Sequence, residues 1–116
     1  MNDDDVVADL VLALLWAGPE ELRLWECVAE WVPEAKDRTP DHVQRTREAL
    51  RTLLDRGWLG LYWDQRPGQP ALSPDEVDAV LADPMQWDWQ GPNDVSMYVL
   101  PAGQLEMERL AAERGQ

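Results

Sequence analysis

The first third of the chain has apolar side chains at helical spacing. Residues 4–17 carry a wide apolar face, which suits a buried helix that ends at Gly18-Pro19. Leu22–Leu24 suits either a very short strand or the start of the next helix, which we expect over Trp25–Trp31. The expected core positions of this second helix are Trp25, Val28, Ala29 and Val32.

The stretch from Thr39 to Asp64 has the clearest pattern, a capped helix followed by a glycine and a strand. Thr39 suits the N-cap and Pro40 the first helical position. Gly57 tolerates a positive φ and therefore predicts the end of this helix. Trp58–Trp63 alternates with a period of two, which is typical of a strand. The expected inward side of the helix comprises Val43, Thr46, Leu50, Leu53 and Leu54.

Residues 65–94 separate this strand from a second one. Within them Ser73–Glu76 forms a capping box that predicts a short helix, and Met85–Pro92 has an irregular pattern. Val95–Leu100 alternates like a strand, and a last helix is expected from Pro101 to about Arg114. The two strands therefore enclose a long insertion with a helix of its own.

Charge adds one feature to this picture. The chain has 23 acidic and 10 basic side chains and a net charge of −13. Residues 1–35 carry a net charge of −8 and residues 67–116 carry −7, whereas residues 36–66 carry +2. The length of 116 residues and the ordinary apolar content fit one domain over residues 1–116. The capped helix and its strand are thus the one region that is not acidic.

The expected location is the cytoplasm. The single cysteine, Cys27, cannot form an internal disulfide, which fits a reducing compartment. The acidic N-terminus is the opposite of a secretory leader. The apolar run Leu10–Ala17 is far shorter than the ~20 residues that cross a membrane. We therefore expect no membrane contact.

The order of these elements resembles that of a winged helix-turn-helix domain. The residues that carry the resemblance are LLDRGWLGLYW (53–63) and MYVLPAGQLEMERL (97–110), and the second is similar to the strand-to-helix corner of MarR- and PadR-like regulators. The resemblance implies an α+β, winged-helix-like fold, with a helical core, a small antiparallel β-sheet and residues 65–94 inserted in the wing. It also implies that Thr39–Arg56 matches the DNA recognition helix and that the protein forms a homodimer.

One candidate site is the polar face of this central helix. Arg45, Arg47 and Arg51 can pair with guanine, and Gln44 can pair with adenine. The alternative, which we favour, is a solvated face with internal ion pairs, namely Asp41–Arg45, Glu48–Arg51 and Arg51–Asp55. The predicted DNA- or partner-contacting residues are Gln44, Arg45, Glu48 and Arg51.

A second candidate site is the pair Trp87 and Trp89. Alternate tryptophans in an irregular loop suit a docking site for a protein partner, because tryptophan is frequent at binding hot spots. The alternative, which we favour, is that both rings pack over the sheet. The core is the expected place of the other five tryptophans, Trp16, Trp25, Trp31, Trp58 and Trp63.

Enzyme chemistry finds little support in the sequence. Cys27 and His42 are expected on different helices, with no third group to orient them as a nucleophile and base. The chain also lacks a glycine-rich phosphate loop and a spaced set of metal ligands. We therefore predict no catalytic, cofactor-binding or metal-binding residues.

Three functions are compatible with these observations. The leading hypothesis is a non-enzymatic bacterial module that uses the winged-helix scaffold to bind a protein, because a net charge of −13 repels phosphate and favours a basic partner. The alternative is a dimeric, sequence-specific DNA-binding transcriptional regulator. A weaker alternative is an inhibitor that mimics DNA and blocks a DNA-binding protein.

Overall fold

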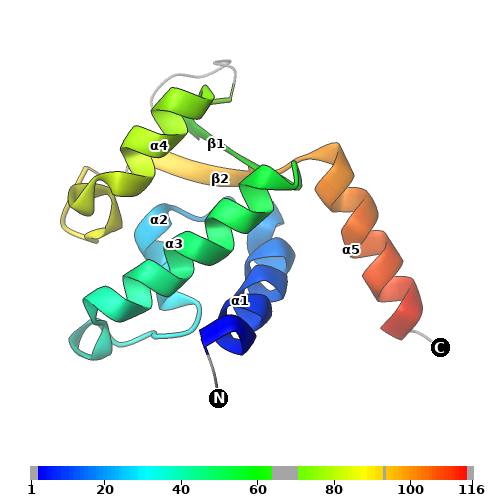
Figure 1. The fold of residues 1–116 in the computed structure, drawn as a ribbon, viewed down its shortest axis with the longest axis horizontal. Coiled ribbons are helices and arrows are strands. Elements are labelled where there is room, and N and C mark those ends of the chain that lie inside the picture. Colours follow the sequence, from blue (N-terminus) through cyan, green and yellow to red (C-terminus); the bar gives the residue numbers. More distant parts are fainter. Residues whose placement is uncertain (1–2, 64–70, 93, 115–116) are drawn as a thin grey trace.

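The structure is a computed structural model that describes residues 3–63, 71–92 and 94–114 (Figure 1). The two strands pair with each other, and short 3-10 turns connect several of the helices. The predicted insertion is described except for residues 65–70 and 93, which lie outside these ranges. The elements are α1 (Asp3–Ala17), α2 (Leu24–Ala29), α3 (Pro40–Asp55), β1 (Leu59–Trp63), α4 (Pro74–Ala82), β2 (Val95–Val99) and α5 (Pro101–Arg114).

Helix α2 differs from its prediction in position and in the side that it buries. It begins at Leu24, where the Glu26 carboxylate accepts a hydrogen bond from the Arg23 amide (2.9 Å) and so caps the helix start. The helix begins one residue earlier than predicted and ends at Ala29, and the side that it buries also differs from the predicted one. Trp25 and Ala29 are only half-buried, and the fully buried positions of α2 are Leu24, Cys27 and Val28.

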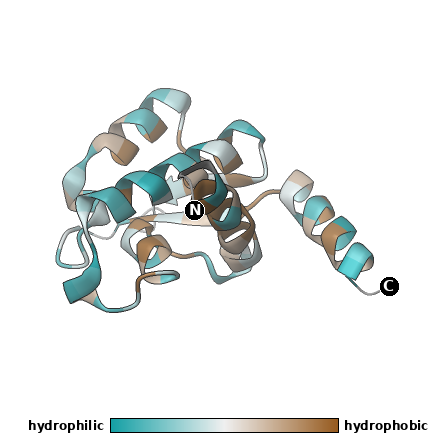
Figure 2. Ribbon diagram, turned by 60° about the horizontal axis from the view of Figure 1, so that its bottom comes forward, coloured by the Kyte–Doolittle hydropathy of each residue, from teal (hydrophilic) through white to brown (hydrophobic). Residues whose placement is uncertain are grey.

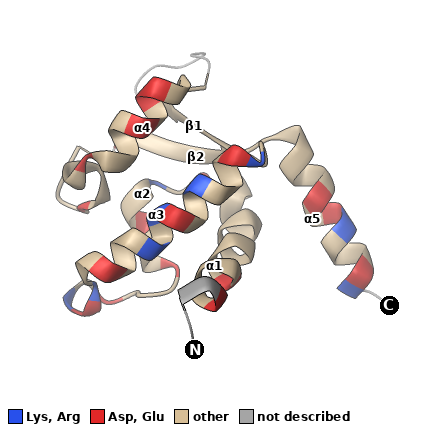
Figure 3. Cartoon of the chain, in the orientation of Figure 1, with Lys and Arg blue, Asp and Glu red and all other residues tan. Residues whose placement is uncertain are grey.

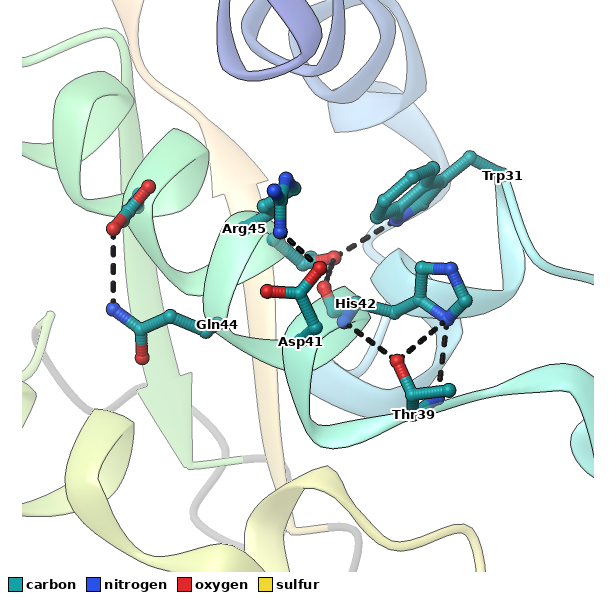
Figure 4. A network of polar contacts seen from close by, with 8 residues as sticks. Trp31, Thr39, Asp41, His42, Gln44 and Arg45 are labelled. Carbon is teal, nitrogen blue, oxygen red and sulfur yellow. Dashed lines mark hydrogen bonds and ion pairs between the residues drawn. The ribbon is translucent and has the colours of Figure 1, made fainter. Parts of the chain in front are cut away.

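Helix α3 begins and ends as predicted. The His42 amide donates to the Thr39 hydroxyl (3.3 Å), and the Thr39 amide donates to His42 Nδ1 (3.0 Å), as Figure 4 shows. Gly57 follows the helix with φ +72°, a conformation that glycine adopts without strain. The buried side of α3 is formed by Thr46, Ala49, Leu50 and Leu53, while Val43 and Leu54 are partly buried.

The sheet is small and antiparallel. Leu59 of β1 lies opposite Val99 of β2, and Trp63 lies opposite Val95. On the other edge of β2, Arg23 forms a bridge with Ser96, so the segment before α2 both pairs with the sheet and starts the helix. The chain therefore has the predicted α+β, winged-helix-like fold with a helical core.

The insertion shares its core with the rest of the molecule. The Leu72 amide donates to the Leu61 carbonyl of β1 (2.9 Å), and the chain then enters α4 through the predicted capping box at Ser73. The segment predicted to be irregular starts with a 3-10 turn, Pro84–Trp87. The buried side chains that the insertion adds to the common hydrophobic core are Leu72, Val77, Val80, Leu81 and Trp87.

Helix α5 extends away from the other elements (Figures 1 and 2). Its buried residues are Gly103, where a side chain would collide with the Trp58 carbonyl group, and Met107. Leu105 is 66% exposed. Within the described ranges, no helix has the length and apolar character needed to cross a membrane.

Candidate functional site

The predicted contact residues of α3 do not form one open face. Gln44 and Glu48 are exposed, and the Gln44 amide donates to the Glu48 carboxylate (3.2 Å). The Arg45 side chain is only 18% exposed and pairs with Asp41, as predicted (Figure 4). Of the two predicted arginine contacts, Arg45 therefore has its guanidinium beside a carboxylate of its own helix.

Arg51 has a partner that the sequence did not indicate. Its guanidinium pairs with Asp78 of α4 (2.6 Å), and within the described part of the chain it forms neither the predicted pair with Asp55 nor that with Glu48. Both predicted pairs assumed an isolated helix. The insertion instead brings a carboxylate of another element to Arg51, so the basic side of α3 is bound by the chain itself.

Arg47, predicted as a possible guanine contact, instead ties α3 to the insertion. Its Nε donates to the Leu81 carbonyl oxygen (2.7 Å), and its guanidinium lies 5.5 Å from the centre of the Trp87 ring. Trp87 Nε1 donates to the same carbonyl (3.0 Å). Leu81 is in the last turn of α4, where carbonyl groups lack helical partners. This one oxygen therefore joins α3, α4 and the Pro84–Trp87 turn.

Trp87 and Trp89 have different environments. Trp87 is 7% exposed and belongs to the core, whereas Trp89 is 54% exposed. The favoured interpretation, that both rings pack down, is therefore wrong for Trp89. Trp87 ends the 3-10 turn and Trp89 lies beyond it, so a spacing of two residues does not place both rings on the same side, as it would in a strand.

The other five tryptophans are half-buried and do not lie inside the core as expected. Among the described residues, arginine side chains lie over three of the rings, with Arg56 4.9 Å from the Trp58 centre. Tryptophan is large and carries an N–H group, and both properties favour the edge of a core. The other two arginine–tryptophan pairs are Arg38 over Trp25 and Arg114 over Trp16.

The two candidate sites meet in one open groove of about 840 Å³ between the start of α3 and the segment Pro84–Trp89. The insertion lies beside α3 in Figure 1, which brings residues more than 40 positions apart together. Of the predicted residues, Gln44, Trp87 and Trp89 line this groove, whereas Arg45, Glu48 and Arg51 do not. The other lining residues are Ala35, Arg38, Thr39, Pro40, Asp41, Val43, Arg47, Pro84 and Asp88.

The basic and acidic side chains of the groove differ in their exposure to solvent. Its two arginines are half-buried, and its two aspartates, Asp41 and Asp88, are exposed. Arg38 donates to the carbonyl oxygens of Val32 (2.9 Å) and Pro33 (2.7 Å), and Arg47 donates to that of Leu81. Helix α3 carries both acidic and basic residues, whereas the charged residues of α4 are all acidic (Figure 3). No residue of α4 lines the groove, whose charged side chains are two arginines and two aspartates.

Cys27 and His42 serve the fold. Cys27 is fully buried with its Sγ 3.8 Å from Met97 Sδ, and burial raises the pKa of this thiol far above its ordinary value. A protonated thiol is a poor nucleophile. His42 caps α3 and packs edge-on against Trp31. Among the described residues, no group of three or more His, Cys, Asp or Glu side chains is arranged to hold a metal ion.

Sequence reasoning missed part of the groove. Arg38 and Pro84 stand in segments without periodicity, so no pattern pointed to them. Val43 was assigned to the core, but it is partly exposed at the groove. Arg47 had a sequence signal, because it lies one helical turn from both Gln44 and Arg51. Its contact with Leu81 depends on the position of the insertion, which only the fold provides.

Comparison with family models, with curated proteins and with solved structures finds no match for this chain.

Proposed function

We propose that this chain is a non-enzymatic regulatory module that binds a basic protein partner through its winged-helix-like scaffold. One observation carries the proposal: the insertion lies on α3 and takes up its basic side chains. Arg47 is bound to the Leu81 carbonyl, and Arg51 pairs with Asp78. We infer a cytoplasmic location from the free, buried thiol of Cys27.

The alternative is sequence-specific DNA binding, which the helix–turn–helix order of α2 and α3 favours. DNA binding draws much of its affinity from Lys and Arg side chains that neutralise phosphates. In this chain the acidic helix α4 lies beside α3, and its Asp78 is paired with Arg51. A phosphate backbone approaching this side of α3 would meet acidic groups, which is why we rank protein binding first.

The test is a titration of the full chain against random fragments of its own genome, at low and at physiological salt. We expect no fragment to be retained at physiological salt. Sequence-selective retention at that salt concentration, lost in Arg45→Ala and Arg51→Ala, would overturn the proposal in favour of a DNA-binding regulator. In parallel, affinity capture from cell extract should yield a basic protein that is released as the salt concentration rises.

A further inference from the structure

We propose that the groove between the start of α3 and Pro84–Trp89 binds a small organic acid, whose anionic group lies at the guanidinium groups of Arg38 and Arg47 and whose apolar body covers the apolar part of the groove. This inference goes beyond the proposed function, because it concerns a small-molecule ligand and not the protein partner. It can therefore fail while the proposed function stands.

The two arginines of the groove keep a charge that no carboxylate of the described chain balances. Arg38 donates to two backbone carbonyl oxygens of the segment that follows α2. Arg47 donates to the Leu81 carbonyl (2.7 Å) and to the side-chain oxygen of Gln44 (2.5 Å). All of these acceptors are neutral, and within the described ranges neither arginine forms an ion pair. These contacts use only part of each guanidinium's N–H groups, so donors remain for an anion.

The two aspartates of the groove are engaged by groups outside its lining. Asp41 pairs with Arg45, which does not line the groove (Figure 4). The Asp88 carboxylate accepts a hydrogen bond from the Gln90 amide (3.0 Å), and Gln90 is not a lining residue either. The half-buried charges of the groove are thus positive. A charge that is partly withdrawn from water favours a hydrogen-bonded partner of opposite charge.

The rest of the lining suits an apolar body. Helix α3 contributes Pro40 and Val43, and the insertion contributes Pro84 and Trp87. Trp87 is held in place by its hydrogen bond to the Leu81 carbonyl, so this surface is formed before a ligand arrives. A volume of about 840 Å³ is within the range of small-molecule sites in proteins. An inorganic anion would leave the apolar lining uncovered, which is why we infer an acid with an apolar body.

The net charge of −13 acts on such a ligand from a distance, whereas the two arginines act at contact. At physiological ionic strength the Debye length is about 8 Å, so the exposed acidic groups farther away are largely screened. Half-buried charges are screened much less. The local charge of the groove therefore decides which ligand it binds.

The probes are 2-naphthoate and 2-naphthamide, which share one apolar body and differ in charge. Equilibrium dialysis against the full chain measures both affinities. We expect 2-naphthoate to bind roughly tenfold more tightly than 2-naphthamide, because hydrogen bonds between charged groups contribute more than those to a neutral amide.

Gln44→Glu tests the position of the anionic group. Arg47 already donates to the Gln44 side chain, so a carboxylate at this position would balance the charge of Arg47 within the chain and repel the ligand. The affinity for 2-naphthoate should fall roughly tenfold, and that for 2-naphthamide should not change.

Gln104→Glu is the matched control, because Gln104 is exposed on α5, outside the groove, and the substitution adds the same charge. Its affinity for 2-naphthoate should equal that of the parent chain. Gln44 and Gln104 are both exposed, so both variants should fold, which a melting curve verifies.

Three outcomes would overturn the proposal. Equal affinities for the acid and the amide would show that the arginines do not select an anion. The same affinity for 2-naphthoate in Gln44→Glu and Gln104→Glu would place the anion outside the groove. Retention of neither probe at millimolar concentration would show that the groove binds no such ligand. The proposed function would remain, because the titration with genomic fragments tests it separately.

Discussion

Two segments accompany the winged-helix-like core, the insertion between β1 and β2 and the helix α5, and they are attached in different ways. The insertion buries Leu72, Val80 and Leu81 in the common core and hydrogen-bonds to both β1 and α3. Helix α5 buries little beyond Gly103 and Met107 and extends away from the other elements. The comparison indicates that the insertion is a structural part of the fold. Helix α5 contacts the rest of the molecule at Gly103 and Met107 and, at its end, through Arg114 over the Trp16 ring.

This difference bears on function, because only the insertion shapes the groove. Its Pro84–Trp89 segment forms one wall, and the contacts of Trp87 and Arg47 with the Leu81 carbonyl position that wall against α3. A change that loosens the insertion should therefore affect stability and binding together. A change in α5 should leave the groove as it is.

The largest expected effect comes from truncating the insertion's core. Leu81 is 2% exposed, so Leu81→Ala should lower the free energy of unfolding by about 2–5 kcal/mol, since it removes buried apolar contacts and leaves a cavity. Leu105→Ala in α5 should change it by less than about 0.5 kcal/mol. Urea denaturation followed by circular dichroism measures both. If both substitutions lower the free energy of unfolding equally, the insertion is no more a structural part of the fold than α5 is.

The anchor of α5 can be broken by adding one methyl group. A Cβ at Gly103 would collide with the Trp58 carbonyl group, which is backbone and cannot turn aside. Gly103→Ala should therefore displace the first turn of α5 at a cost of about 1–3 kcal/mol.

Limited proteolysis should detect this displacement as faster cleavage at the β2–α5 junction. Ala102→Gly is the control, because residue 102 is exposed in the same turn. If Gly103→Ala is cleaved no faster than the parent chain, α5 is not anchored at this contact.

Structural features set by residues close together in the sequence were predicted, whereas contacts between residues far apart in the sequence were not. Thr39, Ser73 and Gly57 act through neighbours within a few residues, and the helix starts and the helix end that they predicted are confirmed. The sheet also agrees, because its strands alternate over several residues. The partner of Arg51 was predicted wrongly, since Asp78 is 27 positions away and local spacing cannot find it.

The candidate site shows the same limit. Gln44, Trp87 and Trp89 were each chosen on local grounds, and the sequence had no means of showing that they line one groove. Trp87 is buried and donates to the Leu81 carbonyl, whereas Trp89 is 54% exposed. Such a contact depends on the end of α4 meeting the Pro84–Trp87 turn.

A smaller effect is expected from the junction at the Leu81 carbonyl. Trp87→Phe keeps a buried aromatic ring but removes the Nε1 donor, while Arg47 still donates to the same oxygen. The loss should therefore be about 1–3 kcal/mol, because one hydrogen bond is lost and the smaller ring leaves part of a buried site unfilled. Chemical denaturation gives the value. A loss above that of Leu81→Ala would mean that the junction, and not the apolar core, holds the insertion.

The smallest expected effect is at the ion pair between α3 and α4. Arg51 and Asp78 are 40% and 66% exposed, so solvent screens their attraction, and a double-mutant cycle with Arg51→Ala and Asp78→Ala should give a coupling of about 0.2–1 kcal/mol. The coupling should vanish at roughly 1 M salt, where the Debye length is about 3 Å. A coupling that persists there would show that the pair is shielded from solvent. The insertion would then be held on α3 by charge as well as by its apolar side chains. Its attachment would therefore differ from that of α5 in kind and not only in extent.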